Sequence, residues 1–484
     1  MDQTSDSRPP RQWNHHIAGA FSAPDSGEHL DEIDPRNGQP SFRIARGNAA
    51  DVQRAVESAD AALQGWRGTR ALERARVLQR IAQAIRSNAD ELARIEQIET
   101  GKPLNQARGD IEIAAQYFDF YGGLAPSIEG ETIDLGTGKL CYTLKEPYGV
   151  IGVILPWNAP VNQAARAIAP ALAAGNTVVA KPSEFTSVSS LRLAELAHEA
   201  GLPAGAVNVV TGTGLEVGRE IVGHPKVAKI AFTGSLRAGK EIGIQAAERV
   251  LPVTLELGGK SPDIVFADAD LEAAARGAVR GFTVNAGQAC IAGTRILVEQ
   301  PVADRFVALM KAEAAKLKVG AGDDCQIGPI ITGPQHQRIR EYFEIARQDG
   351  AHVVTGGQMS GASGADGYFV EPTIFTGLPA DSRVVREEIF GPVCAVLTFA
   401  DEDDAIRIAN DTHFGLAAGL WTQNLSRAHR VAARLQAGQI YVNEYPSGGV
   451  ETPFGGYKQS GIGREKGREA LNHYTQIKTV IVTL

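Results

Sequence analysis

Two short segments near the middle of the chain carry side chains that can form and hydrolyse a covalent intermediate. Glu256 lies in segment 255–260, Leu-Glu-Leu-Gly-Gly-Lys, and Cys290 ends segment 285–290, Asn-Ala-Gly-Gln-Ala-Cys. A thiolate can attack a carbonyl carbon, and a carboxylate can activate the water that hydrolyses the resulting thioester. A single cysteine is more often an inert, buried residue. The pair therefore indicates chemistry only if the rest of the chain supplies a binding site.

A third polar side chain follows an apolar run in a way that suits an oxyanion donor. The run Val150–Leu155 leads through Pro156 and Trp157 to Asn158. An asparagine amide at the end of a strand can point its N–H groups into a cleft and stabilise a developing negative charge. Asparagine before a proline-containing loop is also a common turn residue, so the position alone leaves both interpretations open.

Two further segments at predicted strand ends suit nucleotide binding. Segment 232–235, Phe-Thr-Gly-Ser, follows a strand and opens a helix, where glycine lets main-chain N–H groups face a pyrophosphate. Lys181 and Glu184 follow another strand, and ligands of parallel sheets bind at the carboxyl ends of strands. Glu184 can accept hydrogen bonds from ribose hydroxyls, and Lys181 can donate to them. Taken alone, the first segment is equally a plain turn and the second a surface ion pair.

The hydrophobic pattern predicts how these side chains are positioned. Residues 49–120 show helical periodicity, and from residue 150 short β-branched runs alternate with amphipathic stretches, which indicates βαβ units and parallel sheets. The first predicted strands are Val150–Leu155, Thr177–Ala180, Ala206–Val210, Lys229–Phe232 and Val253–Leu257, with a helix over Ser187–Ala200. The second set is Asp263–Phe266, Arg295–Glu299, Val393–Phe399 and Ile440–Val442, with helices over Val302–Leu317 and Ser426–Leu435. The Gly258-Gly259 turn between the sets is the predicted domain boundary of an α/β protein.

Two β-rich segments, 128–144 and 475–484, fit neither set of strands. Exposed strands tend to pair because their unpaired main-chain groups template association, so we expect an oligomeric contact here. The Gly-, Ser- and Ala-rich segment Met359–Gly367 is expected to be a surface loop without chemistry.

Composition narrows the class of protein. At 484 residues the chain is too long for one core, and two or three domains are expected. A hydrophobic content of 43% with 21% charged residues is typical of a soluble globular protein. The net charge of −8 argues against binding to nucleic acid or to an anionic membrane.

The cysteines and histidines indicate neither a disulfide framework nor a metal site. Cys141, Cys290, Cys325 and Cys394 lack C-x-x-C spacing, so reduced thiols are expected, and the ten histidines form no metal motif. Residues 1–10 lack the apolar core of a signal peptide, and the longest apolar run is too short to span a bilayer. We expect a cytoplasmic protein with no metal, no membrane and no nucleic acid as partner.

The order of the chemical segments matches a known pattern. The chain resembles the NAD(P)-dependent aldehyde dehydrogenase superfamily over nearly its whole length. The matching segments are Pro156–Asn158, Lys181–Glu184, Phe232–Ser235, Leu255–Lys260, Gly287–Cys290, Glu388–Pro392, and Pro453–Lys458 through Gly461–Glu465. Seven motifs in the order of the family, with the spacing from Glu256 to Cys290 also matching, make a chance resemblance negligible.

The resemblance implies a role for each candidate residue. Cys290 is similar to the nucleophile of the family, Glu256 to the general base for hydrolysis, and Asn158, with the Cys290 main-chain N–H, to the oxyanion hole. The implied cofactor is NAD⁺, with NADP⁺ as the alternative. Positions similar to cofactor contacts are Leu155, Pro156, Trp157, Lys181, Glu184, Gly214, Gly218, Phe232, Gly234, Ser235, Leu257, Glu388 and Phe390.

The resemblance also implies an architecture. A Rossmann-like NAD-binding domain is expected over residues 1–127 and 146–258, and an α/β catalytic domain over 259–470. A small β oligomerisation arm is expected over residues 128–145 and 471–484, which predicts a homodimer or homotetramer.

Several positions near the implied substrate tunnel depart from the commonest family pattern. Ala159 stands where many members carry Phe, which predicts a wider tunnel, and Ala167 replaces a frequent Lys, which argues against a lysine-assisted proton relay. Arg166 is similar to an arginine that binds the carboxylate of semialdehydes, but Val284 is apolar where a second arginine often occurs. The candidate substrate contacts are Ala159, Arg166 and Ile291. We therefore expect uncharged aromatic or medium-chain aliphatic aldehydes as substrates.

Three alternatives remain open. A semialdehyde dehydrogenase would bind the substrate carboxylate with Arg166. A CoA-acylating relative would transfer the acyl group to CoA, but such relatives typically lack the general base, so Glu256 argues against it. An inactive protein that reuses the fold would have little reason to retain Cys290, Glu256 and Asn158 together.

Overall fold

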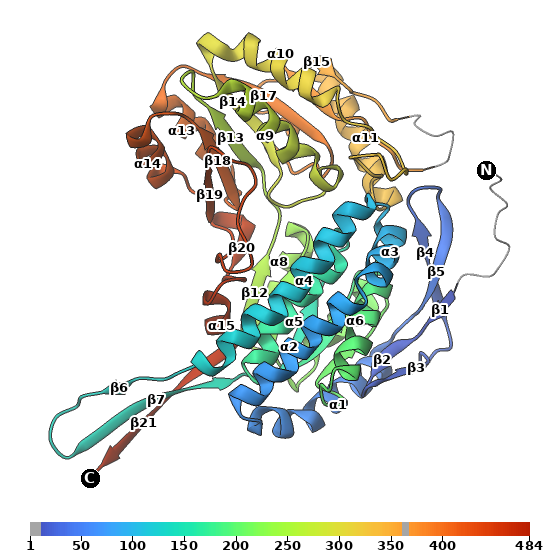
Figure 1. Ribbon diagram of the computed structural model, residues 1–484, viewed down its shortest axis with the longest axis vertical. Coiled ribbons are helices and arrows are strands. Elements are labelled where there is room, and N and C mark those ends of the chain that lie inside the picture. The colour runs from blue at the N-terminus through green and yellow to red at the C-terminus, as the bar shows by residue number, and fades with distance from the viewer. Residues whose placement is uncertain (1–10, 361–366) are drawn as a thin grey trace.

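The computed structural model describes residues 11–360 and 367–484, and it shows two α/β lobes with a projecting β arm (Figure 1). The expectations for residues 1–10, and for most of the loop 359–367, fall outside the described residues. Within the described ranges, none of the helices is long and apolar enough to cross a bilayer. The mixed α/β class predicted from the alternating pattern is confirmed.

The first lobe is built on a sheet whose central strands are parallel. In order across the sheet its strands are β20 (Gly461–Ile462), β12 (Val253–Glu256), β11 (Val227–Thr233), β8 (Val150–Ile154), β9 (Thr177–Lys181), β10 (Val207–Val209), β2 (His15–Ile17) and β3 (Ala20–Ser22). The five strands predicted for this half are confirmed to within two residues at each end. Their almost uniform burial reflects helices on both faces, which is why they appear in the sequence as short continuous apolar runs.

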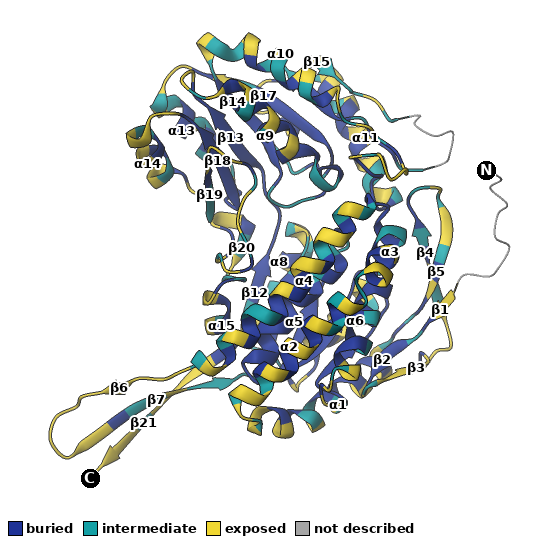
Figure 2. Ribbon diagram, viewed as in Figure 1, coloured by how far each residue is buried: buried dark blue, intermediate teal, exposed yellow. Residues whose placement is uncertain are grey.

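Helices cover both faces of this sheet. They are α1 (Ala49–Gly68), α2 (Ala71–Ser87), α3 (Ala89–Thr100), α4 (Leu104–Leu124), α5 (Pro160–Ala173), α6 (Val188–Glu199), α7 (Arg219–Gly223) and α8 (Leu236–Glu248). The helical periodicity of residues 49–120 is therefore confirmed. Asn48 begins α1 with a capping box to Asp51, and Gly101 ends α3 with a φ of 69°, where a left-handed residue suits glycine. Figure 2 shows the buried inner faces of these helices against the sheet.

The second lobe contains a mostly parallel sheet. Across it the strands run β15 (His352–Thr355), β16 (Thr373–Thr376), β17 (Val393–Phe399), β14 (Gly293–Glu299), β13 (Ser261–Val265), β18 (Ala417–Trp421) and β19 (Gln439–Val442). Its helices are α9 (Leu271–Thr283), α10 (Ala303–Ala314), α11 (Gly333–Gln348), α12 (Arg383–Arg386), α13 (Glu402–Asn410) and α14 (Leu425–Arg434). The four strands predicted here are confirmed, whereas β15, β16 and β18 were not predicted. Strand β18, Ala-Ala-Gly-Leu-Trp, is poor in β-branched residues. Its pairing with β13 and β19, rather than its own strand propensity, makes it a strand.

The ends of the chain wrap around the first lobe. The N-terminal strands β1 (Arg11–Trp13), β4 (His29–Asp34) and β5 (Gln39–Ala45) form a small sheet beside it, which the sequence pattern did not predict. Strand β20 pairs antiparallel with β12, and α15 (Glu469–His473) follows it. The chain thus rejoins the first sheet at Gly461, within the range 259–470 expected for the catalytic domain. A two-residue Gly-Ile strand carries no strand signal of its own.

The β arm consists of β6 (Thr132–Ile133), β7 (Lys139–Pro147) and β21 (Thr475–Thr483). Strands β7 and β21 pair antiparallel along their whole length, from Thr475 opposite Pro147 to Thr483 opposite Lys139. The arm extends away from both lobes (Figure 1), and Figure 2 shows β6 and most of β21 as exposed and much of β7 as intermediate. The two β-rich segments that fitted neither sheet thus form one element.

Candidate active site

The three predicted catalytic side chains come together where the two lobes meet. Asn158 follows β8, Glu256 ends β12, and Cys290 lies in the loop between α9 and β14. They line one cavity of about 150 Å³. Its lining residues are Pro156, Trp157, Asn158, Gln163, Thr233, Gly234, Ser235, Glu256, Leu257, Gly258, Cys290, Gln335, Arg338, Glu388 and Phe390. Ten predicted site residues are therefore neighbours although they come from five distant stretches of sequence.

A longer groove of about 740 Å³ lies on the first lobe at the N-terminus of α8. It is lined by the predicted contacts Glu184, Gly214, Gly218 and Phe232. Ser235 lines the Cys290 cavity instead, and it caps α8 by accepting a hydrogen bond from the Ala238 N–H. A side chain at Gly214 would enter open space, so the groove floor is accessible there. A helix N-terminus favours anionic groups, and a groove of this size, lined by Phe232 next to Thr233 of the Cys290 cavity, fits a dinucleotide.

The acidic and basic pair predicted for the ribose is present at the end of β9. Lys181 is buried, and its Nζ donates to Glu184 Oε2 over 3.0 Å. Burial lowers the pKa of Lys181, and the Glu184 carboxylate opposes that change. Glu184 lines the groove while Lys181 lies behind it, so the carboxylate is the group presented to a ligand.

The loop before Cys290 makes an unusual left-handed turn. Asn285, Ala286 and Gly287 have φ angles of 51°, 54° and 72°, which residues other than glycine adopt rarely. The turn is closed by Gln288, whose main-chain N–H and side-chain Nε2 both donate to the Asn285 carbonyl. Such strain at a functional loop persists only where the surroundings determine it.

Asn158 is bonded to this loop from the other lobe. Its Nδ2 donates to the Gln288 carbonyl over 2.9 Å, which turns the amide toward the loop that carries Cys290. Its own main-chain carbonyl accepts from Asn285 Nδ2 at 2.9 Å and from Lys102 Nζ at 3.2 Å. Asn285 and Lys102 were not predicted as site residues, because only the folded chain places them beside Asn158.

Glu256 is buried in a pocket with little polar support. Its side chain is 2% exposed, and within the described residues neither carboxylate oxygen has a hydrogen-bond partner. Burial raises the pKa of Glu256 well above its usual value, although Arg166 and Arg464 oppose the change. A carboxyl with a raised pKa is a suitable general base near neutral pH.

The surroundings of the Cys290 thiol disfavour its thiolate form. Burial raises its pKa to about 12, the Arg166 charge lowers it, and the carboxylates of Glu388 and Glu256 raise it further. The thiol is the weak form of the nucleophile. Attack on a carbonyl therefore requires that a neighbouring group remove this proton or that a positive charge be brought near.

Glu388 and Phe390 are held by the second lobe at the edge of the cavity. Glu388 Oε1 accepts from the Gly259 N–H at 3.1 Å, and a Cβ on Gly258 would lie 2.2 Å from the same carboxylate. The Phe390 ring meets the Trp157 ring edge-on with centroids 5.2 Å apart. Gln335, which was not predicted, donates from Nε2 to the Phe390 carbonyl, and its helix gave no sequence signal for that role.

Comparison with known proteins settles the family. The model of the family described as "Aldehyde dehydrogenase family" matches residues 21–480. The chain belongs to the aldehyde dehydrogenase family. A relative named hydroxyisobutyraldehyde dehydrogenase, from Mycolicibacterium austroafricanum, is 43% identical over 471 residues, which cover 97% of this chain and 93% of the relative.

Solved aldehyde dehydrogenase structures share the whole fold. An NAD-dependent aldehyde dehydrogenase from Sinorhizobium meliloti is 41% identical with a TM-score of 0.96, covering 98% of this chain and 95% of that one. An aldehyde dehydrogenase from Bacillus cereus, solved as an NAD⁺ complex, is 40% identical with a TM-score of 0.96, covering 98% and 97%. The resemblance inferred from the seven segments is therefore confirmed.

In this aldehyde dehydrogenase, Arg166 is committed to partners within the protein. It lies on α5, is 5% exposed, and forms an ion pair with the buried Glu465. Its guanidinium carbon lies 4.2 Å from the centroid of the Phe454 ring. Ala159 precedes α5 and Ile291 follows Cys290, so the two residues are next to the predicted catalytic residues Asn158 and Cys290 in the sequence. Leu155, at the end of β8, is buried in the core.

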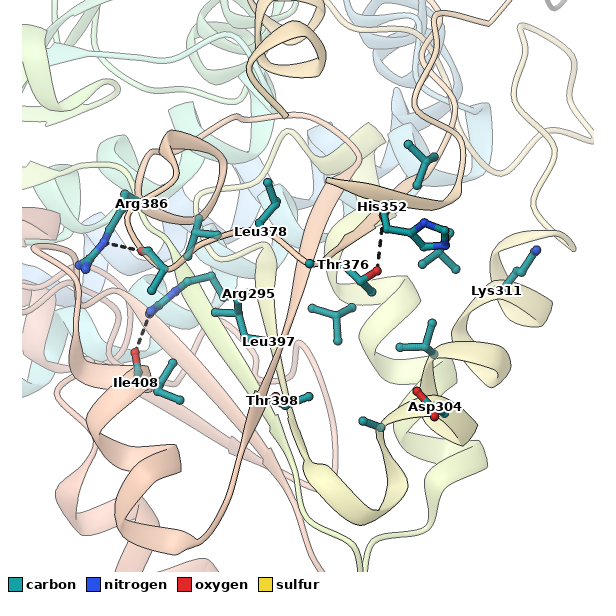
Figure 3. Close-up of a pocket in the computed structure, with 18 of the residues that line it drawn as sticks. Arg295, Asp304, Lys311, His352, Thr376, Leu378, Arg386, Leu397, Thr398 and Ile408 are labelled. Carbon is teal, nitrogen blue, oxygen red and sulfur yellow. Dashed lines mark hydrogen bonds between the residues drawn. The ribbon is translucent and has the colours of Figure 1, made fainter. Parts of the chain in front are cut away.

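A larger hollow on the second lobe is separate from this site. It has a volume of about 760 Å³ and extends over β14, β16 and β17, between α10 and α13. Figure 3 shows Arg295, Lys311, His352 and Arg386 around it, with Arg295 donating to the Ile408 carbonyl. None of the predicted site residues lines it.

Proposed function

We propose that this enzyme oxidises an aldehyde to the free carboxylic acid, with NAD⁺ as hydride acceptor, through a thioester on Cys290. The observation that carries the proposal is that Cys290, Glu256 and Asn158 line one cavity, next to a groove that fits a dinucleotide. The family match and the NAD⁺ complex of a 40% identical relative support the cofactor.

In the first half-reaction the Cys290 thiol loses its proton to water, and the Sγ thiolate then adds to the aldehyde carbon. The carbonyl oxygen becomes an oxyanion, which accepts hydrogen bonds from Asn158 Nδ2 and from the Cys290 main-chain N–H. NAD⁺, when bound in the groove, accepts the hydride from that carbon. Collapse of the oxyanion then gives the thioester, so the carbon is oxidised and no oxygen atom has yet been added.

In the second half-reaction Glu256 removes a proton from a water molecule. The water oxygen adds to the thioester carbon, the C–S bond breaks, and the Cys290 thiolate leaves. The product is the carboxylic acid, and Glu256 carries the proton until solvent removes it. This role suits Glu256, whose raised pKa makes it a stronger base than an exposed carboxylate.

NAD⁺ is proposed to be preferred over NADP⁺. The Glu184 carboxylate lines the groove and suits a ribose 2′-hydroxyl, whereas it repels a 2′-phosphate. Lys181, bonded to Glu184, softens that repulsion and leaves some use of NADP⁺.

The proposed substrates are uncharged aromatic or medium-chain aliphatic aldehydes. Arg166 has its charge compensated by Glu465, and the relative from Mycolicibacterium austroafricanum is named for an uncharged hydroxyaldehyde. A semialdehyde dehydrogenase that uses Arg166 remains the alternative. A CoA-acylating activity is less compatible with Glu256 in the cavity.

The β arm and the cysteines support a proposed assembly and location. We propose a homodimer or homotetramer formed through the arm, because Ile477 and Ile481 on β21 are 71% and 60% exposed. Four free cysteines accord with a cytoplasmic location.

The test is the Cys290→Ala variant, assayed by NADH formation from benzaldehyde or hexanal. We expect turnover to be abolished while NAD⁺ binding, measured by calorimetry, stays within about two-fold, since the groove is intact. Cys325→Ala is the matched control, because Cys325 is a half-buried thiol outside the cavity, and it should keep normal activity. Substantial turnover by Cys290→Ala would remove the proposed nucleophile.

A further inference from the structure

A buried lysine outside the cavity is directed at the main chain of Asn158. Lys102 is 3% exposed and lies in the turn between α3 and α4. Its Nζ donates to Glu96 Oε1 at 2.8 Å, to Asp110 Oδ2 at 2.7 Å and to the Asn158 carbonyl at 3.2 Å. The three donors of the ammonium are thus satisfied in three directions, which fixes its position.

The carboxylates keep this lysine charged. Glu96 and Asp110 raise the pKa of Lys102 even though its burial opposes them. Asp110 also accepts from Asn162 Nδ2 at 2.9 Å, so it connects Lys102 to the first turn of α5, which begins two residues after Asn158. The lysine is therefore held by α3 and α4, and Asp110 connects it to α5, the helix that follows Asn158.

A second donor reaches the same carbonyl from the other lobe. Asn285 Nδ2 donates both to the Asn158 carbonyl at 2.9 Å and to the Gln288 carbonyl at 3.2 Å. The turn that carries Lys102 also touches the second lobe, because a Cβ on Gly101 would lie 2.3 Å from Pro329. The Pro329 carbonyl in turn accepts from Gln288 Nε2 at 3.3 Å. Lys102, Asn158, Gln288 and Pro329 are thus linked in one continuous set of contacts across the lobe boundary.

We propose that Lys102 and Asn285 are positioning residues that hold Asn158 as an oxyanion donor beside Cys290. The inference rests on the proposed role of Asn158. The two halves of the oxyanion hole lie on different lobes, and a donor aimed at a developing charge must hold its geometry to a fraction of an ångström. Fixing the carbonyl of Asn158 from both sides fixes the Cα from which its amide projects.

The first test is a double-mutant cycle with Lys102→Met and Asn158→Ala. Asn158→Ala alone should lower kcat by about 10²–10³-fold, the typical loss of one oxyanion donor. Lys102→Met alone should lower kcat by at least about ten-fold with the Kd for NAD⁺ unchanged. In the Asn158→Ala background the same lysine change should lower kcat by less than about three-fold, since residues acting through one another are not additive.

A matched control and a conservative variant separate positioning from folding. Lys229 is likewise buried and donates to Thr254 Oγ1, away from Asn158, so Lys229→Met should keep the wild-type kcat per folded molecule. Lys102→Arg, which retains the charge and donors, should recover part of the activity. If Lys102→Met fails to fold, the cycle is run with Asn285→Gly, because glycine accepts the φ of 51° while losing both amide hydrogen bonds.

Each outcome decides the question. If Lys102→Met or Asn285→Gly lowers kcat by the same factor in wild type and in Asn158→Ala, the residue has a general structural role and the proposal is overturned. A normal kcat for Lys102→Met would overturn it as well. If Asn158→Ala keeps the wild-type kcat, the proposed role of Asn158 fails. The single variant alone shows this, so failure of the proposed function is distinguished from failure of the positioning role.

Discussion

The carbonyl oxygen of Gly391 occupies the space where a side chain at Gly287 would begin. A Cβ on Gly287 would lie 2.1 Å from that oxygen and 2.6 Å from the Pro392 nitrogen. The turn before Cys290 thus packs directly on the main chain that carries Glu388 and Phe390. The loop of the proposed nucleophile and the loop of the proposed cofactor contacts therefore touch at Gly287 without a side chain between them.

Gly287→Ala is therefore expected to move the nucleophile. The left-handed φ of 72° alone costs an alanine about 1–2 kcal/mol, and contact with a main-chain carbonyl adds to it. We expect kcat to fall by at least about ten-fold and the melting temperature to drop. Gly109→Ala is the control, because that glycine lies within α4 with open space around its Cα, and there alanine should stabilise the helix by about 1 kcal/mol. Wild-type kcat in Gly287→Ala would show that the contact is not needed.

Glu256→Gln is expected to separate the two half-reactions. An amide cannot take a proton from water, so stopped-flow measurement should show a burst of NADH followed by a much slower steady state. This burst appears provided hydride transfer is faster than hydrolysis. A variant with the wild-type steady-state rate would exclude Glu256 as the base.

The same residue predicts the pH dependence of turnover. Glu256 acts as a base only when ionised, and burial raises its pKa, so the steady-state kcat should rise with pH through that raised pKa rather than near 4.5. Glu256→Gln should lose this acidic limb. A wild-type profile that is flat down to pH 5 would contradict the raised pKa.

Cofactor choice is expected to depend on the Glu184 carboxylate. Wild type should show a higher kcat/KM with NAD⁺ than with NADP⁺, and Glu184→Gln should lower that ratio by about ten-fold, equivalent to ~1.4 kcal/mol. Glu248 lines the same groove, so Glu248→Gln provides a carboxylate control that should leave the ratio unchanged. Comparable kcat/KM with both cofactors in wild type would defeat the preference.

The sequence predicted those parts of the fold that have a local cause. The strands that were predicted appear as β-branched runs, and the helices of residues 49–120 appear as apolar periodicity, so neighbouring residues in the sequence indicate them. Strand β18 and the two-residue β20 were not predicted, because long-range pairing determines them. The short N-terminal strands were not predicted for the same reason.

The site residues likewise divide into those that the sequence could predict and those that it could not. Cys290, Glu256 and Asn158 lie in segments whose type and order are recognisable, so the chain itself suggested them. Lys102 and Gln335 act through hydrogen bonds to main-chain carbonyls far away in sequence. Such contacts leave no local pattern, and only the packing of α3, α4 and α11 reveals them.

Substrate charge is the property on which Arg166 bears most directly. Its ion pair with Glu465 and its contact with the Phe454 ring compensate the charge of this buried cation, while its Nη2 has no hydrogen-bond partner among the described residues. A substrate carboxylate would have to displace Glu465 or share the guanidinium with it, and either choice leaves a buried anion poorly compensated. We therefore expect benzaldehyde or hexanal to have a higher kcat/KM than succinic semialdehyde.

The decisive measurement compares these substrates in wild type and in variants of the ion pair. Arg166→Leu alone leaves Glu465 buried without its partner, which typically costs about 3–5 kcal/mol, so Arg166→Leu combined with Glu465→Gln is the variant of choice. If Arg166 is structural, the double variant should lower kcat/KM for charged and uncharged aldehydes by the same factor. The opposite interpretation, that Arg166 binds a substrate carboxylate, requires succinic semialdehyde to be preferred by wild type and to lose its advantage selectively in the variant.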